Sequence, residues 1–366
     1  MTTTLLDRPG PPVLQIDDDI TRRRFVTGGL AAGLLTLAGC GRADKDNQVA
    51  PTATTGPRGA FPVTIEHRYG STTVPAEPQR VVALGLTDVD PMLALGVKPV
   101  GFVDWYGPYE QADIRSGVWP WSHDAIGDAR PTVMPRNDDK FNFETVASLR
   151  PDLIIAQYTG MTAEEYGLAS RIAPTVAQSA EHPDFEAPWD FTTRVIGRAL
   201  GQSERAEQII AEVEDRFAQA RRQHPELSGK TAVLVDFFEG ALYARGPTEP
   251  HGKVLAELGF GYPPEIEALI PYGNVLAELS LEQIGLLDTA DVLIVGDFDG
   301  KRELRANPLY QALDAVSQGR VVPGVEPIEG ALYWATVASL PFALDGLVPM
   351  LAAAVDGDPA TPVAVP

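Results

Sequence analysis

Short apolar runs alternate with helical patterns from residue 80 onward, and glycine or proline closes many of them. Apolar runs at 81–84, 153–156 and 292–295 indicate strands that are covered on both faces. The stretch 88–95 has the pattern of a short helix, which Gly96 ends. Because strands that alternate with helices are typical of parallel sheets, the pattern predicts an α/β fold.

The same criteria give the remaining predicted elements. Further strands are expected at 98–103, 175–177, 231–237 (with a partner at 241–244) and 320–322. Helices are expected at 142–149, 162–172, 190–200, 251–258 and 281–287, with a further element at 308–316.

One stretch of the sequence occurs twice. Asn142 and Glu144 open a predicted helix that leads into a strand, and Ser280 and Glu282 open a second copy with one extra residue. Asn142 or Ser280 can cap its helix, and each glutamate lies in the first turn, where the helix dipole favours a carboxylate. The repeat predicts two α/β lobes with one plan.

A long helix is predicted between the two copies, over residues 203–224. Gly201 precedes this segment, and Pro225 and Gly229 follow it. Its apolar positions fall at helical spacing: Ala206, Ile209, Ile210, Val213, Phe217 and Ala220. From position alone, the helix either connects the lobes or packs on one of them.

The N-terminal segment has the pattern of an export signal. A twin-arginine string at 21–26 leads into an apolar run at 26–38, which is too short to span a bilayer. The run ends in Leu-Ala-Gly-Cys, the pattern of a lipoprotein cleavage site at Cys40. We therefore expect residues 1–39 to be a twin-arginine lipoprotein signal peptide, Cys40 to carry lipid, and 40–60 to be a flexible tether.

The charge and the cysteine count restrict the possible partners. The net charge is −21, and residues 1–40 carry four arginines and four acidic residues, so the excess of acid lies in the remainder. A chain with this excess of acidic residues is not expected to bind nucleic acid or anionic lipid, because like charges repel. Cys40 is the only cysteine, so no disulfide or thiolate metal site is expected once it carries lipid.

Five segments together resemble a known family. In order, they are 78–84, 95–101, 142–155, 279–284 and 307–310. The chain resembles the helical-backbone class of ABC substrate-binding proteins for ferric siderophores, haem and cobalamin over about residues 62–350. It looks most like the actinobacterial iron–siderophore lipoproteins.

The resemblance implies a class III periplasmic-binding-protein fold, with two Rossmann-like lobes joined by one long helix. The lobes would be 61–202 and 225–366, with 203–224 between them. The chain would capture a ferric siderophore between the lobes and deliver it to an ABC permease, which Glu144 and Glu282 would contact. We expect a monomer held by its lipid at the outer face of the cell membrane, without a cofactor. Haem and cobalamin remain alternative ligands.

Candidate ligand contacts follow from the rule that open α/β sheets bind ligands beyond the carboxyl ends of their strands. Aromatic faces suit a large, partly apolar chelate, and three of the five tryptophans lie between 105 and 121. The aromatic candidates are Trp105, Tyr106, Tyr109, Trp119, Trp121, Tyr158, Phe237, Phe238, Tyr333 and Trp334. Arg130, Arg136 and Arg245 are candidates for charge-assisted bonds to chelator oxygens.

Two other classes of protein fit the sequence less well. A binder of Zn²⁺ or Mn²⁺ needs converging imidazoles and carboxylates, whereas the five histidines are scattered along the chain. An enzyme is not indicated, because the sequence lacks a Gly-x-Ser-x-Gly elbow, a Walker loop, a Gly-x-Gly-x-x-Gly turn and a His-Glu-x-x-His motif. Non-covalent binding remains the favoured function.

Overall fold

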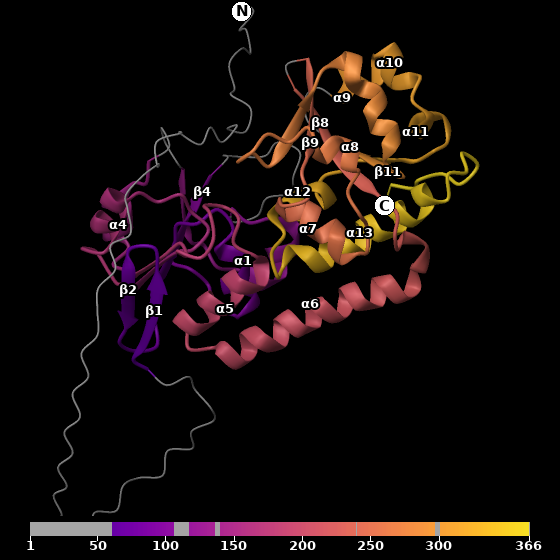
Figure 1. Cartoon of the computed structure of the whole chain (residues 1–366). Coiled ribbons are helices and arrows are strands. Elements are labelled where there is room, and N and C mark those ends of the chain that lie inside the picture. The colour runs from indigo at the N-terminus through magenta and orange to yellow at the C-terminus, as the bar shows by residue number, and fades with distance from the viewer. Residues whose placement is uncertain (1–60, 106–116, 136–139, 239, 297–300, 366) are drawn as a thin grey trace, which may run out of the picture. The chain divides into compact units, whose positions relative to one another are not determined.

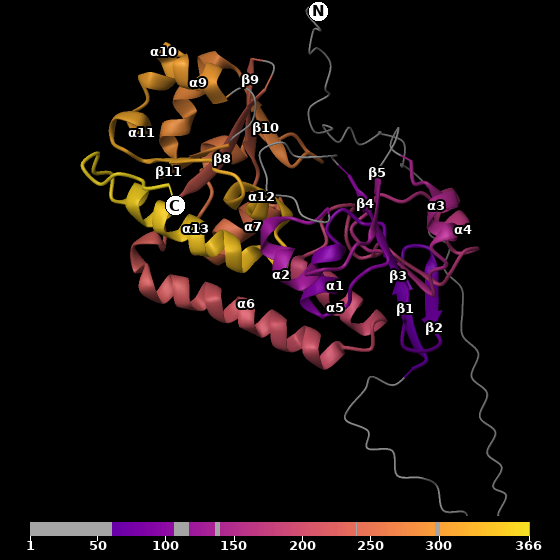
Figure 2. The same ribbon diagram turned by 180° about the vertical axis from the view of Figure 1, so that it is seen from behind.

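The computed structural model describes residues 61–105, 117–135, 140–238, 240–296 and 301–365. These residues belong to one compact unit, 57–366. Figure 1 shows a first lobe in indigo to magenta and a second in orange to yellow, with one long helix running along both. Figure 2 shows the same arrangement from behind.

The first lobe contains a short hairpin and a five-stranded sheet with helices on both faces. Its elements are β1 (Val63–His67), β2 (Gly70–Val74), β3 (Val81–Ala83), α1 (Val89–Ala94), β4 (Gly101–Asp104), the 3₁₀ helix η1 (Pro120–Ser122), α2 (His123–Ile126), β5 (Thr132–Pro135), α3 (Phe143–Ser148), β6 (Leu153–Ala156), α4 (Ala163–Ala169), β7 (Thr175–Ala177) and α5 (Trp189–Ala199). The sheet has the order β5-β4-β3-β6-β7, and every pair is parallel. The central strands β3 and β6 are buried along their whole length, as expected of a parallel sheet covered on both faces.

The second lobe contains a five-stranded sheet of mixed direction. Its elements are the 3₁₀ helix η2 (Pro225–Leu227), β8 (Ala232–Phe238), β9 (Ala241–Arg245), α7 (Pro250–Glu257), α8 (Pro264–Glu267), β10 (Leu276–Leu279), the 3₁₀ helix η3 (Leu281–Thr289), β11 (Val292–Val295), α9 (Lys301–Ala306), α10 (Pro308–Gln311), α11 (Asp314–Ser317), β12 (Val321–Pro323), α12 (Ile328–Trp334) and α13 (Ser339–Val355). The order is β10-β9-β8-β11-β12. The strands β8, β11 and β12 are parallel, whereas β9 and β10 are antiparallel to their neighbours. The prediction of parallel sheets is therefore incomplete here, because a short connection between β8 and β9 requires an antiparallel pair.

The long helix predicted over 203–224 is α6 (Ser203–Gln223), with 21 residues. Its buried side chains are those that the helical spacing predicted: Ala206, Ile209, Ile210, Val213, Phe217 and Ala220. It packs against α5 of the first lobe and α13 of the second, so it connects the two (Figures 1 and 2).

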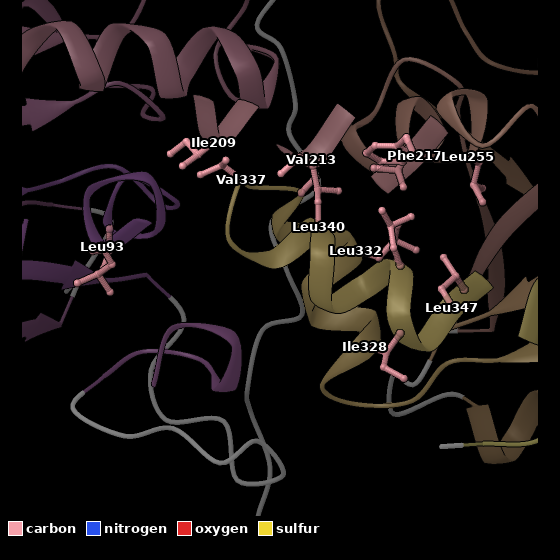
Figure 3. Packing of buried hydrophobic residues seen from close by; sticks show 14 of the residues in the cluster. Leu93, Ile209, Val213, Phe217, Leu255, Ile328, Leu332, Val337, Leu340 and Leu347 are labelled. Carbon is pink, nitrogen blue, oxygen red and sulfur yellow. The ribbon is translucent and has the colours of Figure 1, made fainter. Parts of the chain in front are cut away.

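One hydrophobic core continues from lobe to lobe. It includes Leu93 of α1, Val213 and Phe217 of α6, and Leu340 and Leu347 of α13, all of which Figure 3 labels. One face of each sheet also contributes to it, while the opposite faces pack against separate clusters within their own lobes. Because packed interiors resist deformation, a shared core limits how far the lobes can move relative to one another.

The helices of the predicted repeat begin as expected. The Asn142 side chain accepts a hydrogen bond from the backbone nitrogen of Thr145 at 3.0 Å, which caps α3. Ser280 and Gln283 form a reciprocal capping box at the start of η3. The second copy is therefore a 3₁₀ helix with the same cap position.

An aspartate follows the helix in each copy and secures the strand beside it. Asp152 accepts hydrogen bonds from the backbone nitrogens of Gln79 and Arg80, at 2.8 and 2.9 Å, where β3 begins. Asp291 accepts one from the backbone nitrogen of Thr231 at 2.8 Å, where β8 begins. The two lobes thus share this contact as well as their sequence pattern.

Several elements were not predicted from the sequence. Among these are β5, β10, α2, α8, α9, α12 and α13, and the predicted element at 308–316 is divided into α10 and α11. The helix α13 contains Pro349 in its interior and Pro341 in its first turn. Because proline normally interrupts a helix, local pattern favours a break here, and burial against α6 and α12 overrides it.

Candidate functional site

A small cavity lies between the two lobes. Thr87 and Tyr158, which follow β3 and β6, line its first-lobe side, and Trp334 and Thr336 line its second-lobe side. Its volume is about 70 Å³, which is well below the roughly 300–1,000 Å³ of a pocket for a drug-sized ligand. Residues 106–116, 136–139, 239 and 297–300 follow β4, β5, β8 and β11 and lie outside the described residues.

Asp88 organises the first-lobe side of this cavity. Its carboxylate accepts hydrogen bonds from the backbone nitrogens of Gly85, Gln157 and Tyr158, at 3.0, 2.9 and 3.0 Å. Complete burial raises the pKa of the Asp88 carboxyl to about 6, although these three hydrogen bonds lower it. One side chain thus holds together the segments that follow two neighbouring strands.

Aromatic rings gather beyond the same strand ends. Trp105 donates through Nε1 to the backbone oxygen of Leu84 at 3.0 Å, and its ring meets Phe185 edge-on with centroids 5.5 Å apart. Tyr158 packs against Phe185 at 5.8 Å and donates its hydroxyl hydrogen to the backbone oxygen of that residue. Trp105 and Tyr158 therefore lie together, as the strand-end argument predicted. Phe185 comes from a distant loop, and no sequence pattern marks it as part of this cluster.

Trp119 and Trp121 lie in the interface between the lobes. Their rings stack with centroids 5.0 Å apart, and Trp119 is only 6% exposed. Across the interface, Trp119 meets Trp334 at 5.1 Å and Trp121 meets Phe342 at 6.0 Å. These two tryptophans therefore pack the lobes together, a role that the aromatic spacing did not predict.

Polar contacts also bridge the lobes beside the cavity. Lys253 of α7 donates to the backbone oxygen of Glu186 at 3.3 Å. Burial raises the pKa of the Glu257 carboxyl, and a hydrogen bond from Trp189, at the start of α5, opposes that rise. These contacts close one flank of the interface.

Arg245 lies in a buried ionic network of the second lobe. Its Nε donates to Asp236 Oδ2 at 2.6 Å and its Nη1 to Glu249 at 3.3 Å. Tyr333 donates to Asp236 Oδ1 at 2.9 Å, and the Arg245 guanidinium lies 5.7 Å from the centre of its ring. Glu249 also pairs with His251 at 3.1 Å. Arg245, predicted to contact ligand, is therefore engaged with carboxylates of its own lobe.

The remaining candidates lie in different surroundings. Phe237 is 3% exposed in the core of the second lobe, so its ring is not available to a ligand there, whereas Phe238 is half-buried at the end of β8. The exposed Arg130 donates to the backbone oxygen of Ala129 at 2.8 Å. Tyr106, Tyr109, Arg136 and Cys40 lie outside the described residues.

Glu144 and Glu282 occupy equivalent, exposed positions on the two lobes. Glu144 lies in the first turn of α3 and Glu282 in the first turn of η3. Neither forms an ion pair within the described part of the chain.

The described ranges contain no cluster of three or more His, Cys, Asp or Glu side chains able to hold a metal ion. His67 pairs with the Thr72 hydroxyl at 2.9 Å, and burial lowers its pKa. Of the helices in the described ranges, none combines the length and apolar character needed to cross a membrane.

Two α/β lobes, one connecting helix and a cavity between the lobes define a class III periplasmic binding protein. The family profile described as periplasmic binding protein matches residues 81–324, and the chain belongs to this family. It is an extracytoplasmic transport component of the ABC importer type, whose partner is a permease, and it is not an enzyme.

The proteins that are similar to most of the chain include the following three. A periplasmic solute-binding protein from Mycobacterium smegmatis is 34% identical, with a TM-score of 0.71, over 80% of this chain and 98% of its own. PiaA from Streptococcus pneumoniae, solved with ferrichrome, is 25% identical, with a TM-score of 0.67, over 81% of this chain and 99% of its own. A putative ABC transporter substrate-binding lipoprotein of Bacillus subtilis, YhfQ, is 28% identical over 71% of this chain and 80% of its own.

Four residues of the site were not among the sequence-based candidates: Gly85, Asp88, Asp90 and Phe185. Asp88 and Asp90 open a short helix directly after a buried strand, which is the only signal the sequence offers. Acidic residues at that position are ordinary helix-start residues, so this signal does not distinguish them from simple caps.

Proposed function

We propose that this chain captures a ferric siderophore between its lobes and delivers it to an ABC permease. The observation that carries the proposal is the convergence of Tyr158 and Trp334, one from each lobe, on a single interlobe cavity. Trp105 and Tyr158 both contact the ring of Phe185, so three aromatic side chains gather at the strand ends of the first lobe. The similarity to a protein solved with ferrichrome supports this class of ligand.

The chelate would occupy the outer part of the interface, because a cavity of about 70 Å³ is too small to enclose it. Trp105, Tyr158, Phe238 and Trp334 are the described residues proposed to contact it. Tyr106, Tyr109 and Arg136 remain proposed contacts outside the described residues, and Arg130, on the first lobe, remains a proposed contact as well. The proposed contact residues would be supported by side chains that do not touch the ligand, namely Trp119, Trp121, Tyr333 and Arg245.

The experiment is a titration of the full chain with ferric hydroxamate, catecholate and carboxylate chelates, haem, cobalamin and Zn²⁺. Tryptophan emission should be quenched by one ferric chelate, and calorimetry should give the same Kd, which excludes optical absorption by the ligand. Saturable binding of haem or cobalamin would assign one of the alternative ligands of this fold. Binding of Zn²⁺ alone would favour a metal-ion transporter, and no binding at all would contradict the proposal.

Glu144 and Glu282 are proposed to contact the permease, one on each lobe. Both are exposed and carry like charge at matching positions of the repeat. Complementary charge across an interface steers association and fixes orientation. The acidic side chains would therefore meet basic pockets on the permease.

Export and anchoring are proposed from the N-terminal segment. The twin-arginine string at 21–26 would direct export, and acylation of Cys40 would hold the protein at the outer face of the membrane, as the lipoprotein relative suggests. Cys40→Ala should abolish incorporation of labelled fatty acid and release the chain from the membrane fraction. Replacing Arg22 and Arg23 by lysine should leave the chain inside the cell, and unchanged export would contradict the twin-arginine assignment.

A further inference from the structure

One buried carboxylate at the interface accepts hydrogen bonds from both lobes. Asp90 lies in the first turn of α1 and is 5% exposed. Its Oδ1 accepts from the Ser122 hydroxyl at 2.8 Å, and its Oδ2 accepts from Trp121 Nε1 at 2.8 Å. Oδ2 also accepts from the hydroxyl of Thr336, which belongs to the second lobe, at 2.7 Å.

The second-lobe partner is held in place independently. Thr336 lies between α12 and α13, after Ala335, whose backbone is left-handed at φ 43°. The Thr336 hydroxyl oxygen accepts a hydrogen bond from the backbone nitrogen of Ser339 at 3.0 Å, and its own nitrogen donates to the Ser339 hydroxyl at 2.9 Å. Its hydroxyl hydrogen is therefore directed to Asp90.

The same carboxylate fixes the aromatic contact between the lobes. Trp121, bound to Asp90, stacks on Trp119, which meets Trp334 edge-on. Trp334 and Thr336 both line the interlobe cavity. Asp90 is thus connected to the end of α12 in two ways. It binds the Thr336 hydroxyl directly, and it binds Trp121, which stacks on Trp119 and so contacts Trp334.

We propose that Asp90 is a positioning residue, whose hydrogen bonds set the separation of the two lobes and so place Trp334 for capture of the ligand. The ligand part of this inference rests on the proposed function, whereas the separation of the lobes does not. Burial opposes a charge at Asp90, and no cation in the described ranges pairs with it. The geometry of the hydrogen bonds, rather than a charge on Asp90, therefore sets the separation of the lobes.

Asparagine can keep this geometry. With its oxygen in the place of Oδ2, Asp90→Asn accepts from Trp121 and Thr336, and its amide group donates to the Ser122 hydroxyl oxygen, which can accept. Asp90→Ala leaves all three donors without their acceptor, and two of them, the hydroxyls of Ser122 and Thr336, belong to buried residues. The two variants separate hydrogen-bond geometry from charge.

The test measures the distance between the lobes and the affinity for a chelate in the same chains. The full chain carrying Cys40→Ser receives spin labels at Glu164→Cys and Gln311→Cys, exposed positions on the first and second lobe. Asp90→Ala should broaden the distance distribution and weaken the Kd for the chelate found above about tenfold, the size of one lost buried hydrogen bond. Asp90→Asn should keep both the distance distribution and the Kd close to those of the wild type.

Asp345→Asn is the matched control. Asp345 is an exposed carboxylate of α13 that pairs with Arg216 of α6 at 2.7 Å, so it also spans α6 and the second lobe. Neither measurement should change in this variant.

A lowered melting temperature in Asp90→Ala with unchanged distances would make Asp90 a stabilising residue only and would overturn the proposal. Equal behaviour of Asp90→Asn and Asp90→Ala would also overturn it. Thr336→Val tests the same contact from the other lobe if Asp90→Ala fails to fold. It should broaden the distances, whereas Thr336→Ser, which keeps a hydroxyl that can donate to Asp90 and accept from the Ser339 nitrogen, should not. A wild-type chain that binds no chelate would refute the proposed function, and the distances would still decide the role of Asp90.

Discussion

Gly85 and Asp88 meet at the end of β3 in a contact that leaves no room for a side chain at position 85. The backbone nitrogen of Gly85 donates to Asp88 Oδ2 at 3.0 Å, and a Cβ atom added to Gly85 would lie 2.2 Å from that same oxygen. Because Asp88 also holds the backbone of Gln157 and Tyr158, this close approach fixes the first-lobe side of the interlobe cavity.

Gly85→Ala should therefore destabilise the protein and disturb the site. Either Asp88 moves and loses its backbone hydrogen bonds or the strand end shifts, which should cost about 1–3 kcal/mol in the free energy of unfolding. Gly167→Ala is the control, because Gly167 is in α4 with no atom near the added Cβ, so this change should be neutral or stabilise by up to about 1 kcal/mol. Chemical denaturation measures both, and equal stability of the two variants would contradict the close contact.

Asp88 should give the folded protein a distinctive dependence on pH. Its pKa is raised by burial from 3.8 to about 6, so the folded state holds this proton more tightly than the unfolded state. The resulting contribution to stability is fully present below pH 3.8 and is lost as the pH rises through 6, by about 3 kcal/mol at most.

Asp88→Asn removes this titration, so denaturation curves of the two proteins should be compared between pH 4 and pH 7. The free energy of unfolding of the wild type minus that of the variant should fall as the pH rises. In the variant, the asparagine NH₂ group faces one of the backbone N–H groups that donate to Asp88 in the wild type. Two donors then meet without an acceptor, which lowers the stability of the variant at every pH. A difference that does not change with pH would contradict the raised pKa of Asp88.

The network around Arg245 should matter for stability more than an exposed ion pair does. Arg245→Met leaves the Asp236 carboxylate buried without its cation, which should cost about 3–5 kcal/mol in the free energy of unfolding. Arg216→Met, which removes the exposed pair with Asp345, should cost under about 1 kcal/mol. The double variant Arg245→Met with Asp236→Asn should lose less than the sum of the single changes. Additive losses would indicate that the two side chains act independently.

Charge reversal should separate permease contact from ligand binding. Glu144→Lys or Glu282→Lys should leave the Kd for the chelate within about twofold of the wild type, because both residues lie in exposed first turns. Uptake by cells that depend on the transporter should fall about tenfold or more, as when a charge pair at an interface is reversed.

Glu164→Lys serves as the control for these variants, since Glu164 is an exposed acid in the first turn of α4 and is not part of the repeat. It should leave uptake unchanged. A loss of chelate binding in Glu144→Lys or Glu282→Lys, with uptake falling only in proportion, would contradict the permease role.

Local pattern determined much of the scaffold. The strands at 153–156, 175–177 and 292–295 have the predicted bounds, and α6 buries the six side chains whose spacing predicted it. These features depend on the periodicity of neighbouring residues, which a single sequence contains in full. The helix α13 was not predicted, because prolines interrupt its local pattern and contacts with distant helices stabilise it.

The candidate site was predicted only in part. Tyr158 and Trp334 were candidates because they follow predicted elements, and they do line one cavity. Nothing in the sequence distinguishes Trp119 and Trp121, which pack the lobes together, from tryptophans that would contact a ligand. The same holds for Arg245, since an arginine after a strand has the same local signature whether or not a carboxylate lies opposite.

The sequence by itself determined the α/β class of fold, the repeat and the existence of the long helix at 203–224, because each of these arises from short-range pattern. The contacts of α6 with α5 and α13 decided that this helix connects the lobes. Only the tertiary structure decided which polar groups meet across the interface. Asp90 and Thr336 are 246 positions apart and form one hydrogen bond of 2.7 Å. A contact of this kind exists only after both lobes have folded onto α6, so local sequence contains no trace of it.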